Sequence, residues 1–404
     1  MVPDRIIEIS SMPYNRISEY YKNGDLFLKI GPQKELNYFF NKFGDQVKKI
    51  EIEYFHVDSD IRMEINKNYI QHIKRCAKNL EELRVKTFSE DKFWEEILNM
   101  SRENGTIFPE VKKFQMEYWT EEKEFKLNLI FPKLEYLTLN SYVSDKNCLK
   151  NVTGLKELTL KKPIIEEHQF EHIFKNNKNM RKIFLSKLEN EETLHWISKY
   201  LPKLESLGVK EPGENFIFRK ENGAVYTLPS VIHFYFEIGA NITDLFKNGD
   251  LSFVMPKLKC LTLDGNGEQY EIFHLLNRFE KLEKVELLVK DRSFLKCISR
   301  LKHIKEFTTT FSGTRFEHLK YMFDNFDEHS ELQILKFIDV YKYDPYAYRI
   351  AMKDINENTM NAVNNDLETN GKSTWILSQG EHIETGKKWI MFERVRPEHK
   401  SGKK

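Results

Sequence analysis

Apolar side chains recur along the chain in a six-residue phrase whose first, fourth and sixth positions are apolar. The phrase is clearest in Leu134–Leu139 and Leu155–Leu160. Its last two apolar positions lie two residues apart, which is the period of a strand that buries one face. With ten further copies, the phrase predicts twelve strand-forming repeats, whose starts are spaced 21 to 33 residues apart. The further copies start at Val47, Leu80, Val111, Met180, Leu204, Val231, Leu258, Leu282, Ile304 and Leu332.

Between the predicted strands lie stretches with the apolar spacing of a half-buried helix, as for Leu194 and Ile197. Alternation of strands and helices predicts an α/β fold with a parallel sheet. Because no single repeat can bury its apolar face alone, the repeats are expected to stack on one another as a solenoid. The predicted helices are Lys67–Lys78, Glu90–Met100, Glu166–Asn176, Glu191–Tyr200, Gln269–Phe279 and Arg315–Phe326.

The two ends of the repeat region carry different patterns. Upstream, Asp25–Ile30 alternates like a strand and precedes a helical stretch, Lys34–Lys42. Downstream, Pro345–Leu367 is predicted to be helical, and Thr374–Leu377 and Trp389–Phe392 are predicted to form a hairpin. We expect this helix and hairpin to close the last repeat and cover a sheet edge that would otherwise be unpaired.

The repeated phrase resembles that of the leucine-rich-repeat family, in particular its cysteine-type or F-box-associated branch. The resemblance spans Val47 to Val340. It implies a curved right-handed solenoid with a parallel sheet on the concave face and helices on the convex face. The Asn or Cys that the family carries after the last Leu is mostly absent, with Asn140 approximating it. Buried main-chain groups in the loops must therefore find other partners.

The N-terminal residues resemble parts of an F-box, the three-helix unit that docks a ligase adaptor. Val2–Ile9 is similar to its first helix and Arg16–Tyr21 to the tail of its last helix, while the middle of the module is missing. An ordinary capping helix is the alternative. The expected domains are residues 1–45, an N-terminal cap or F-box remnant; 46–343, the solenoid; 344–396, the C-terminal cap; and 397–404, a basic tail.

Composition narrows the class of protein. The chain has 404 residues and a formal net charge of +1, which argues against a whole-protein field for binding phosphates. Its four cysteines, at positions 76, 148, 260 and 297, show neither a disulfide framework nor paired metal spacing. The chain opens without the apolar run of a signal peptide and contains no stretch of about 18 apolar residues. We therefore expect a cytoplasmic or nuclear protein with no membrane association.

The concave face can be predicted because residues that flank the last apolar position of each phrase point out of the sheet. These positions, which include Ser186, carry five basic and six acidic side chains, unlike the basic stripe of a nucleic-acid groove. Ordinary strand propensity explains any one of these residues. As a group, eight residues suggest a protein-binding surface: Tyr136, Thr138, Asn140, Thr159, Lys161, Phe184, Lys210 and Tyr235.

One motif has the spacing of a metal site. His168, Glu171 and His172 follow the H-x-x-E-H order of inverted zinc peptidases, and a helix would place both histidines on one face. A third ligand from a following helix is not evident, so a zinc hydrolase is only the remotest alternative. No catalytic, metal-binding or cofactor-binding residues are predicted, and no enzyme activity is expected.

The resemblance implies a substrate-recognition subunit of an SCF-type, cullin-RING ubiquitin ligase. A target protein would bind the concave face, and an adaptor subunit would dock at the N-terminus. The alternative is a free-standing leucine-rich-repeat scaffold with no link to ubiquitin. In either case we expect a monomer that binds protein rather than nucleic acid.

Overall fold

The computed structural model divides into two compact units, Met1–Leu204 and Glu205–Lys404, which are described in turn. The domain limits predicted from the sequence stay a prediction. The structure describes residues 28–29, 41, 44–53, 73–86, 99, 108–116, 126–140, 148–161, 168–188, 191–212, 226–238, 254–265, 276, 279–288, 298, 301–310, 316–326, 330–338, 357–370, 372–381 and 388–395.

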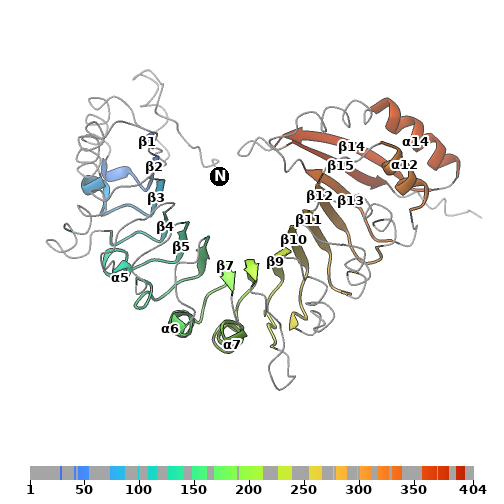
Figure 1. Ribbon diagram of the computed structural model, residues 1–404. Helices are drawn as coiled ribbons and strands as arrows, with labels where there is room; N and C mark the ends of the chain where they lie inside the picture. The colour runs from blue at the N-terminus through green and yellow to red at the C-terminus, as the bar shows by residue number, and fades with distance from the viewer. Residues whose placement is uncertain are drawn as a thin grey trace, which may run out of the picture. The chain divides into compact units, whose positions relative to one another are not determined.

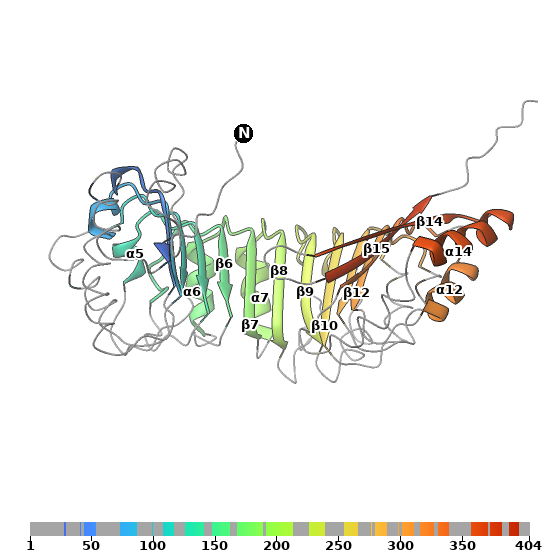
Figure 2. The same cartoon turned by 90° about the horizontal axis from the view of Figure 1, so that it is seen from above.

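The first unit contains a parallel sheet whose strands are paired in chain order (Figures 1 and 2). Each strand pairs in parallel with the next. The strands are β1 Leu28–Lys29, β2 Lys49–Glu53, β3 Glu82–Lys86, β4 Lys113–Met116, β5 Tyr136–Leu139, β6 Glu157–Leu160 and β7 Lys182–Leu188.

The second unit continues the same kind of sheet and ends in an antiparallel hairpin. Its strands are β8 Ser206–Pro212, β9 His233–Ile238, β10 Cys260–Gly265, β11 Lys284–Leu288, β12 Glu306–Thr310, β13 Ile334–Ile338, β14 Thr374–Glu381 and β15 Lys388–Val395. Strands β8 to β13 pair in parallel. Strand β15 then pairs antiparallel with both β13 and β14, so β14 is the outer strand. The predicted α/β class and mostly parallel sheet are confirmed.

All twelve strands predicted from the repeated phrase are present, from β2 to β13, and each begins two residues after the phrase's first apolar residue. Main-chain geometry explains this regularity. Ahead of β2 to β6 and of β8 to β12, one carbonyl accepts hydrogen bonds from two successive amides of the next repeat, as Lys48 O does from Glu81 N at 2.6 Å and Glu82 N at 3.0 Å. The same pair of hydrogen bonds joins Lys259 O to Glu283 N and Lys284 N, each at 2.9 Å. It sets the register in which neighbouring repeats align.

Helices lie on one face of each sheet (Figure 1). Among its described residues the first unit has a short 3-10 turn, η2 Gly44–Gln46, and the helices α5 Leu127–Ile130, α6 His168–Asn176 and α7 Glu191–Tyr200. The second has α12 Phe316–Asp324 and α14 Glu357–Thr369. Helices α6, α7 and α12 lie where the apolar spacing predicted them, whereas α5 was not predicted. Most of 34–42, 90–100 and 269–279, the first half of 67–78 and the first part of 345–367 lie outside the described residues. Within the described half of 67–78, residues 73–76 are helical.

Alternate strand residues form the core of the first unit. In β5 and β6 the second and fourth residues are buried, while the first and third are partly exposed. The buried face meets aromatic rings from the loops and helices. Phe131 stacks on Phe114 at 4.6 Å and on Phe108 at 5.3 Å between ring centroids. Such pairs each add about 0.5–1.5 kcal/mol to the stability that burial provides.

An aromatic cluster closes the core of the second unit beneath the hairpin. Trp375 of β14 is buried and lies 5.2 Å from Phe323 of α12, measured between ring centroids. Phe392 of β15 meets Phe323 edge-on at 5.4 Å and Phe337 of β13 at 6.0 Å. Because these rings join β13, both hairpin strands and α12, the hairpin is part of the core rather than a loose extension.

A buried side-chain amide supplies hydrogen bonds that the loops need. Asn177, which follows α6, accepts from Leu155 N at 2.8 Å. Its Nδ2 donates to Val152 O at 2.9 Å and to Ile173 O at 2.8 Å. Asn177 therefore satisfies main-chain groups of its own helix and of the preceding repeat. Because the chain mostly lacks the Asn that the leucine-rich-repeat family carries after the last Leu, the partners of buried main-chain groups in the loops were left open by the sequence.

Candidate protein-binding face

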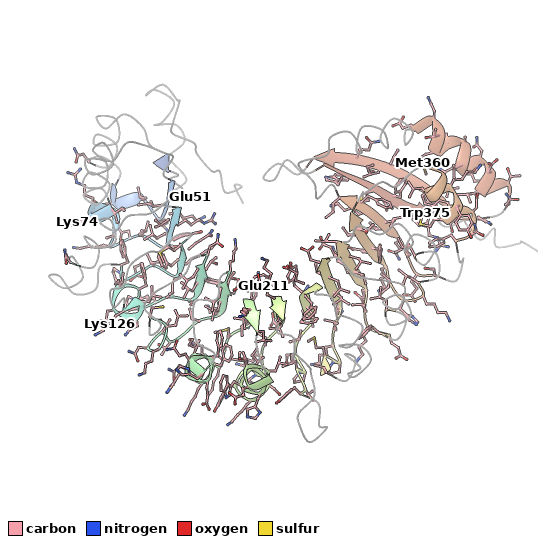
Figure 3. All side chains as sticks on the ribbon, viewed as in Figure 1. Glu51, Lys74, Lys126, Glu211, Met360 and Trp375 are labelled. Carbon is pink, nitrogen blue, oxygen red and sulfur yellow. The ribbon has the colours of Figure 1, made fainter. Side chains whose placement is uncertain are left out.

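Each sheet has one face that none of the described helices covers, and we call it the open face (Figure 1). In the first unit Glu51 lies on the sheet, whereas Lys74 and Lys126 lie on the helical side (Figure 3). On β5, Tyr136 and Thr138 are partly exposed, and the residues between and after them, Leu137 and Leu139, are buried. Side chains of the open face thus remain accessible on a sheet whose other face is fully packed.

The structure brings together the six predicted residues of the first unit. Thr138 pairs directly with Thr159, and Thr159 with Phe184. Past the strand ends, Asn140 N donates to Met116 O and Lys161 N donates to Leu139 O, both at 2.8 Å. These bonds continue the ladder, so the open face of β5 to β7 presents Tyr136, Thr138, Asn140, Thr159, Lys161 and Phe184.

One predicted position is wrong. Ser186, which was expected to point out of the sheet, is buried. The buried and exposed residues of β7 alternate up to Leu185, but both Leu185 and Ser186 are buried. The described pairing of β7 with β6 ends at Leu185, which pairs with Leu160 at the end of β6, so Ser186 lies past the described pairs.

Ion pairs that the sequence reasoning missed join neighbouring repeats where the strands begin. Lys48 Nζ lies 2.9 Å from Glu81 Oε1, and Lys156 Nζ lies 2.8 Å from Glu135 Oε2. One residue further along, Glu82 meets Arg84 at 2.6 Å and Lys113 at 3.1 Å. The signal was present, because Lys and Glu alternate from repeat to repeat at equivalent positions. Opposite charges in direct register favour this alignment over a slipped one.

Glu82 shows how strongly this arrangement favours the charged state. Burial alone would raise the pKa of its carboxyl, but the positive charges of Arg84 and Lys113 and their hydrogen bonds outweigh burial and lower the pKa. Glu82 is therefore ionised at neutral pH and held in place by Arg84 of its own strand and by Lys113 of the next repeat.

Lys210 and Tyr235, the other two predicted residues, lie on the second unit. Lys210 Nζ is 3.5 Å from Glu211 Oε1. The hydroxyl of Tyr235 donates to Asp264 Oδ2 at 3.2 Å. Burial and the negative charge of Asp264 raise the pKa of the Tyr235 hydroxyl, which stays protonated and can act as a donor.

Carboxylates gather around Tyr235 on this open face. Glu237 pairs directly with Asp264, and Thr262, which lies between Tyr235 and Glu286 in the register, donates to Glu286 Oε2 at 3.4 Å. Burial raises the pKa of Glu237; Lys210 counteracts this, while the charges of Asp264 and Glu211 add to it. This end of the second open face is acidic.

The far end of the same face is apolar, which the sequence reasoning did not anticipate. Ile338 of β13 pairs with Trp389 of β15, and both are partly exposed. Ile376 of β14 has 53% of its surface exposed. The Lys336 ammonium lies 5.1 Å from the centre of the Trp389 ring. The alternation in the hairpin was recognised in the sequence, but which face each residue occupies depends on its pairing with β13.

The residues of the zinc motif lie on α6, on the helical side of the first unit. His168 and His172 are exposed, and Glu171 Oε1 accepts a hydrogen bond from Tyr200 at 2.8 Å. Within the described ranges, no three His, Cys, Asp or Glu side chains are grouped so that they could hold a metal ion. None of the described helices is long and apolar enough to cross a bilayer. The residues that resemble an F-box, 1–24, lie outside the described part of the chain.

No family model matches the chain, and no curated protein matches it either. The resemblance to F-box and leucine-rich-repeat proteins rests on the sequence pattern.

Proposed function

We propose that this chain is a protein-binding module built as a leucine-rich-repeat solenoid. The observation that carries the proposal is the open face of a parallel sheet. Parallel sheets in most α/β proteins are covered on both faces. Here the described helices occupy one face only, and strands in direct register present the other (Figures 1 and 2). An uncovered face made by stacked repeats is the usual binding surface of a solenoid.

The side chains of the first unit's open face support a protein partner. Thr138, Thr159 and Phe184 form one directly paired row, and partly exposed aromatics beside small hydroxyls are common in protein interfaces. The neighbouring row of Lys and Glu is mixed in sign and largely paired. A nucleic-acid groove would instead need a continuous basic stripe.

The narrower proposal is that the module selects targets for an SCF-type, cullin-RING ubiquitin ligase, with an adaptor docked at its N-terminus. It is supported by the likeness of Val2–Ile9 and Arg16–Tyr21 to F-box helices and by the repeat pattern that follows. A free-standing repeat scaffold is the alternative.

Site-specific photo-crosslinking tests protein binding through the open face. We would place a photoreactive amino acid at Thr159, on the open face, and at Lys175, an exposed residue on α6, in the full-length chain in cells. The proposal expects discrete adducts from position 159 that weaken when Phe184→Ala is added and that are absent from position 175. Identical adduct patterns from both positions would contradict it.

Adaptor co-purification tests the link to a ligase. The full chain is expected to retain a ligase adaptor that a variant lacking residues 1–24 loses, while the adducts from position 159 persist. If the adducts form but no adaptor is retained by the full chain, the protein-binding module stands and the scaffold alternative replaces the ligase subunit.

A further inference from the structure

The open face of the second unit changes character from one end to the other. We call Glu237, Asp264 and Glu286 its acidic part, and Ile334, Ile338, Ile376, Trp389 and Met391 its apolar part. The acidic part lies on β9 to β11, and the apolar part lies on β13, β15 and β14. Both belong to one sheet within one compact unit, so their relative placement follows from strand pairing.

The acidic part carries negative charge that its neighbours do not balance. Among the described residues, none of the three carboxylates forms an ion pair with Lys or Arg, and Lys210, whose charge acts on Glu237, lies 3.5 Å from Glu211. Asp264 is held by the Tyr235 hydroxyl and Glu286 by the Thr262 hydroxyl. Both bonds fix the carboxylates in position without neutralising them.

The apolar part is assembled by the antiparallel pairing of the hairpin. Ile338 pairs with Trp389, Lys336 with Met391, and both Ile334 and Ile376 with Glu393. Ile376 is 53% exposed, although Trp375 beside it is buried on the other face. A partly exposed Trp next to Met and Ile is the kind of anchor on which binding energy concentrates in protein interfaces.

Geometry sets the length of the segment that would join the two parts. From β10 to β15 the sheet order passes through β11, β12 and β13. Four inter-strand steps of about 4.8 Å amount to about 19 Å, which about six residues of extended chain would cover. A short peptide segment crossing the strands therefore reaches both parts at once.

We propose that the open face of the second unit binds an extended segment of a partner protein that places a Lys or Arg over the acidic part and a large apolar side chain over the apolar part. Charge complementarity selects the basic residue, and the partly exposed Trp389 and Ile338 select the apolar one. The inference rests on the proposed protein-binding function and specifies the chemistry of the partner.

Selection of random peptides tests it. A phage-displayed library of peptides of about twelve residues, long enough to span both parts, is selected on the immobilised full-length chain. Enriched peptides are expected to carry Lys or Arg five to seven residues from Leu, Phe, Trp or Met. Synthetic versions should bind at least about tenfold more weakly to Asp264→Asn, to Glu237→Gln and to Trp389→Ala. Raising the salt concentration should weaken their binding to the native chain.

Matched variants separate binding from folding. Glu280→Gln removes an exposed carboxylate away from the sheet face, and Tyr321→Ala removes an aromatic ring that is 53% exposed on α12; both should bind like the native chain. Thermal melting monitors folding, and Met391→Ser replaces Trp389→Ala if the latter unfolds. Peptides that bind all variants equally, that lack the basic residue, or that pair two copies of the chain would overturn the inference.

The outcomes also distinguish this inference from the proposed function. If no peptide is enriched, or if the peptides ignore the acidic and apolar parts, the inference fails, while adducts at Thr159 of the first unit still support protein binding. If position 159 gives no adduct but the peptides show the expected losses, binding through the first unit's face is wrong and the second unit is the binding surface.

Discussion

The side-chain amide of Asn364 pairs with both main-chain groups of Trp375. Its Nδ2 donates to Trp375 O, and its Oδ1 accepts from Trp375 N, each at 2.9 Å. Trp375 lies on β14, the outer strand of the hairpin, and Asn364 lies on α14. The amide thus takes the place of a neighbouring strand at one point of the sheet edge. Exposed edges invite pairing with other chains, and α14 blocks this one in part.

We predict that Asn364→Ala destabilises the fold by about 1–3 kcal/mol, because Trp375 loses partners for two main-chain groups. Urea unfolding measures the loss. Asn365→Ala on the exposed side of α14 is the control, since it makes the same change in helix propensity without touching β14. We also expect Asn364→Ala to self-associate more at high concentration. Equal stability of the two variants would show that the amide pairing contributes nothing.

The strands could be predicted because each is specified within six adjacent residues. Apolar residues equivalent to Leu137 and Leu139 recur in the repeats, with Thr309 as an exception, and the period alone identifies the buried face. Helices α6 and α7 were visible for the same reason. The contacts of Asn364 with Trp375 and of Asn177 with Leu155 and Val152 could not be predicted, since they span 11 to 25 positions and depend on the fold for their alignment.

The residues of the candidate site also fall into those that the sequence could place and those that it could not. Tyr136, Thr138 and Thr159 were placed correctly because strand alternation decides the face. Ser186 was misplaced because the alternation of buried and exposed residues in β7 breaks after Leu185. The exposed face of Trp389 was missed because only antiparallel pairing with Ile338 puts it beside the open face.

Asn177→Ala is predicted to be strongly destabilising, by roughly 2–4 kcal/mol, because it leaves several buried main-chain groups without partners. Asn177→Asp keeps the acceptor for Leu155 N but loses both donated bonds, so it should not restore stability. The surface control Asn179→Ala, whose side chain accepts a hydrogen bond from Lys203 at 2.9 Å in an exposed pair, should cost less than about 0.5 kcal/mol. Denaturant titration compares the three.

The contributions of Glu82 and Glu237 to the stability of the fold are predicted to change with pH in opposite directions. The lowered pKa of Glu82 means that its carboxylate stabilises the fold fully above the unfolded value of 4.5 and loses this contribution as pH falls through the lower folded value. The raised pKa of Glu237, caused by burial and by Asp264, means that its charge opposes folding at neutral pH and that acid relieves this.

At pH 7, therefore, Glu82→Gln should lower stability by roughly 1–2 kcal/mol, because charge-assisted bonds to Arg84 and Lys113 are lost. Glu237→Gln should leave stability unchanged or raise it. Melting temperatures measured from pH 7 down to about pH 2 should show a constant Glu82→Gln deficit above about pH 5 and a deficit that shrinks as pH falls through the lowered pKa of Glu82. A deficit that is constant with pH would contradict the assigned cause.

Thr309 is the polar exception on the buried side of the sheet. It is 0% exposed and lies between Leu287 and Phe337 in the register, at a position that other strands fill with apolar residues. Its Oγ1 has no hydrogen-bond partner within the described part of the chain. A buried hydroxyl without a partner costs about 1–3 kcal/mol, and Val has nearly the same shape.

We therefore predict that Thr309→Val raises the free energy of unfolding by about 1 kcal/mol. Thr308→Val, on the partly exposed open face, should change it by less than about 0.5 kcal/mol. Urea titration of both variants checks the prediction, and a loss of stability in Thr309→Val would mean that the hydroxyl is paired after all.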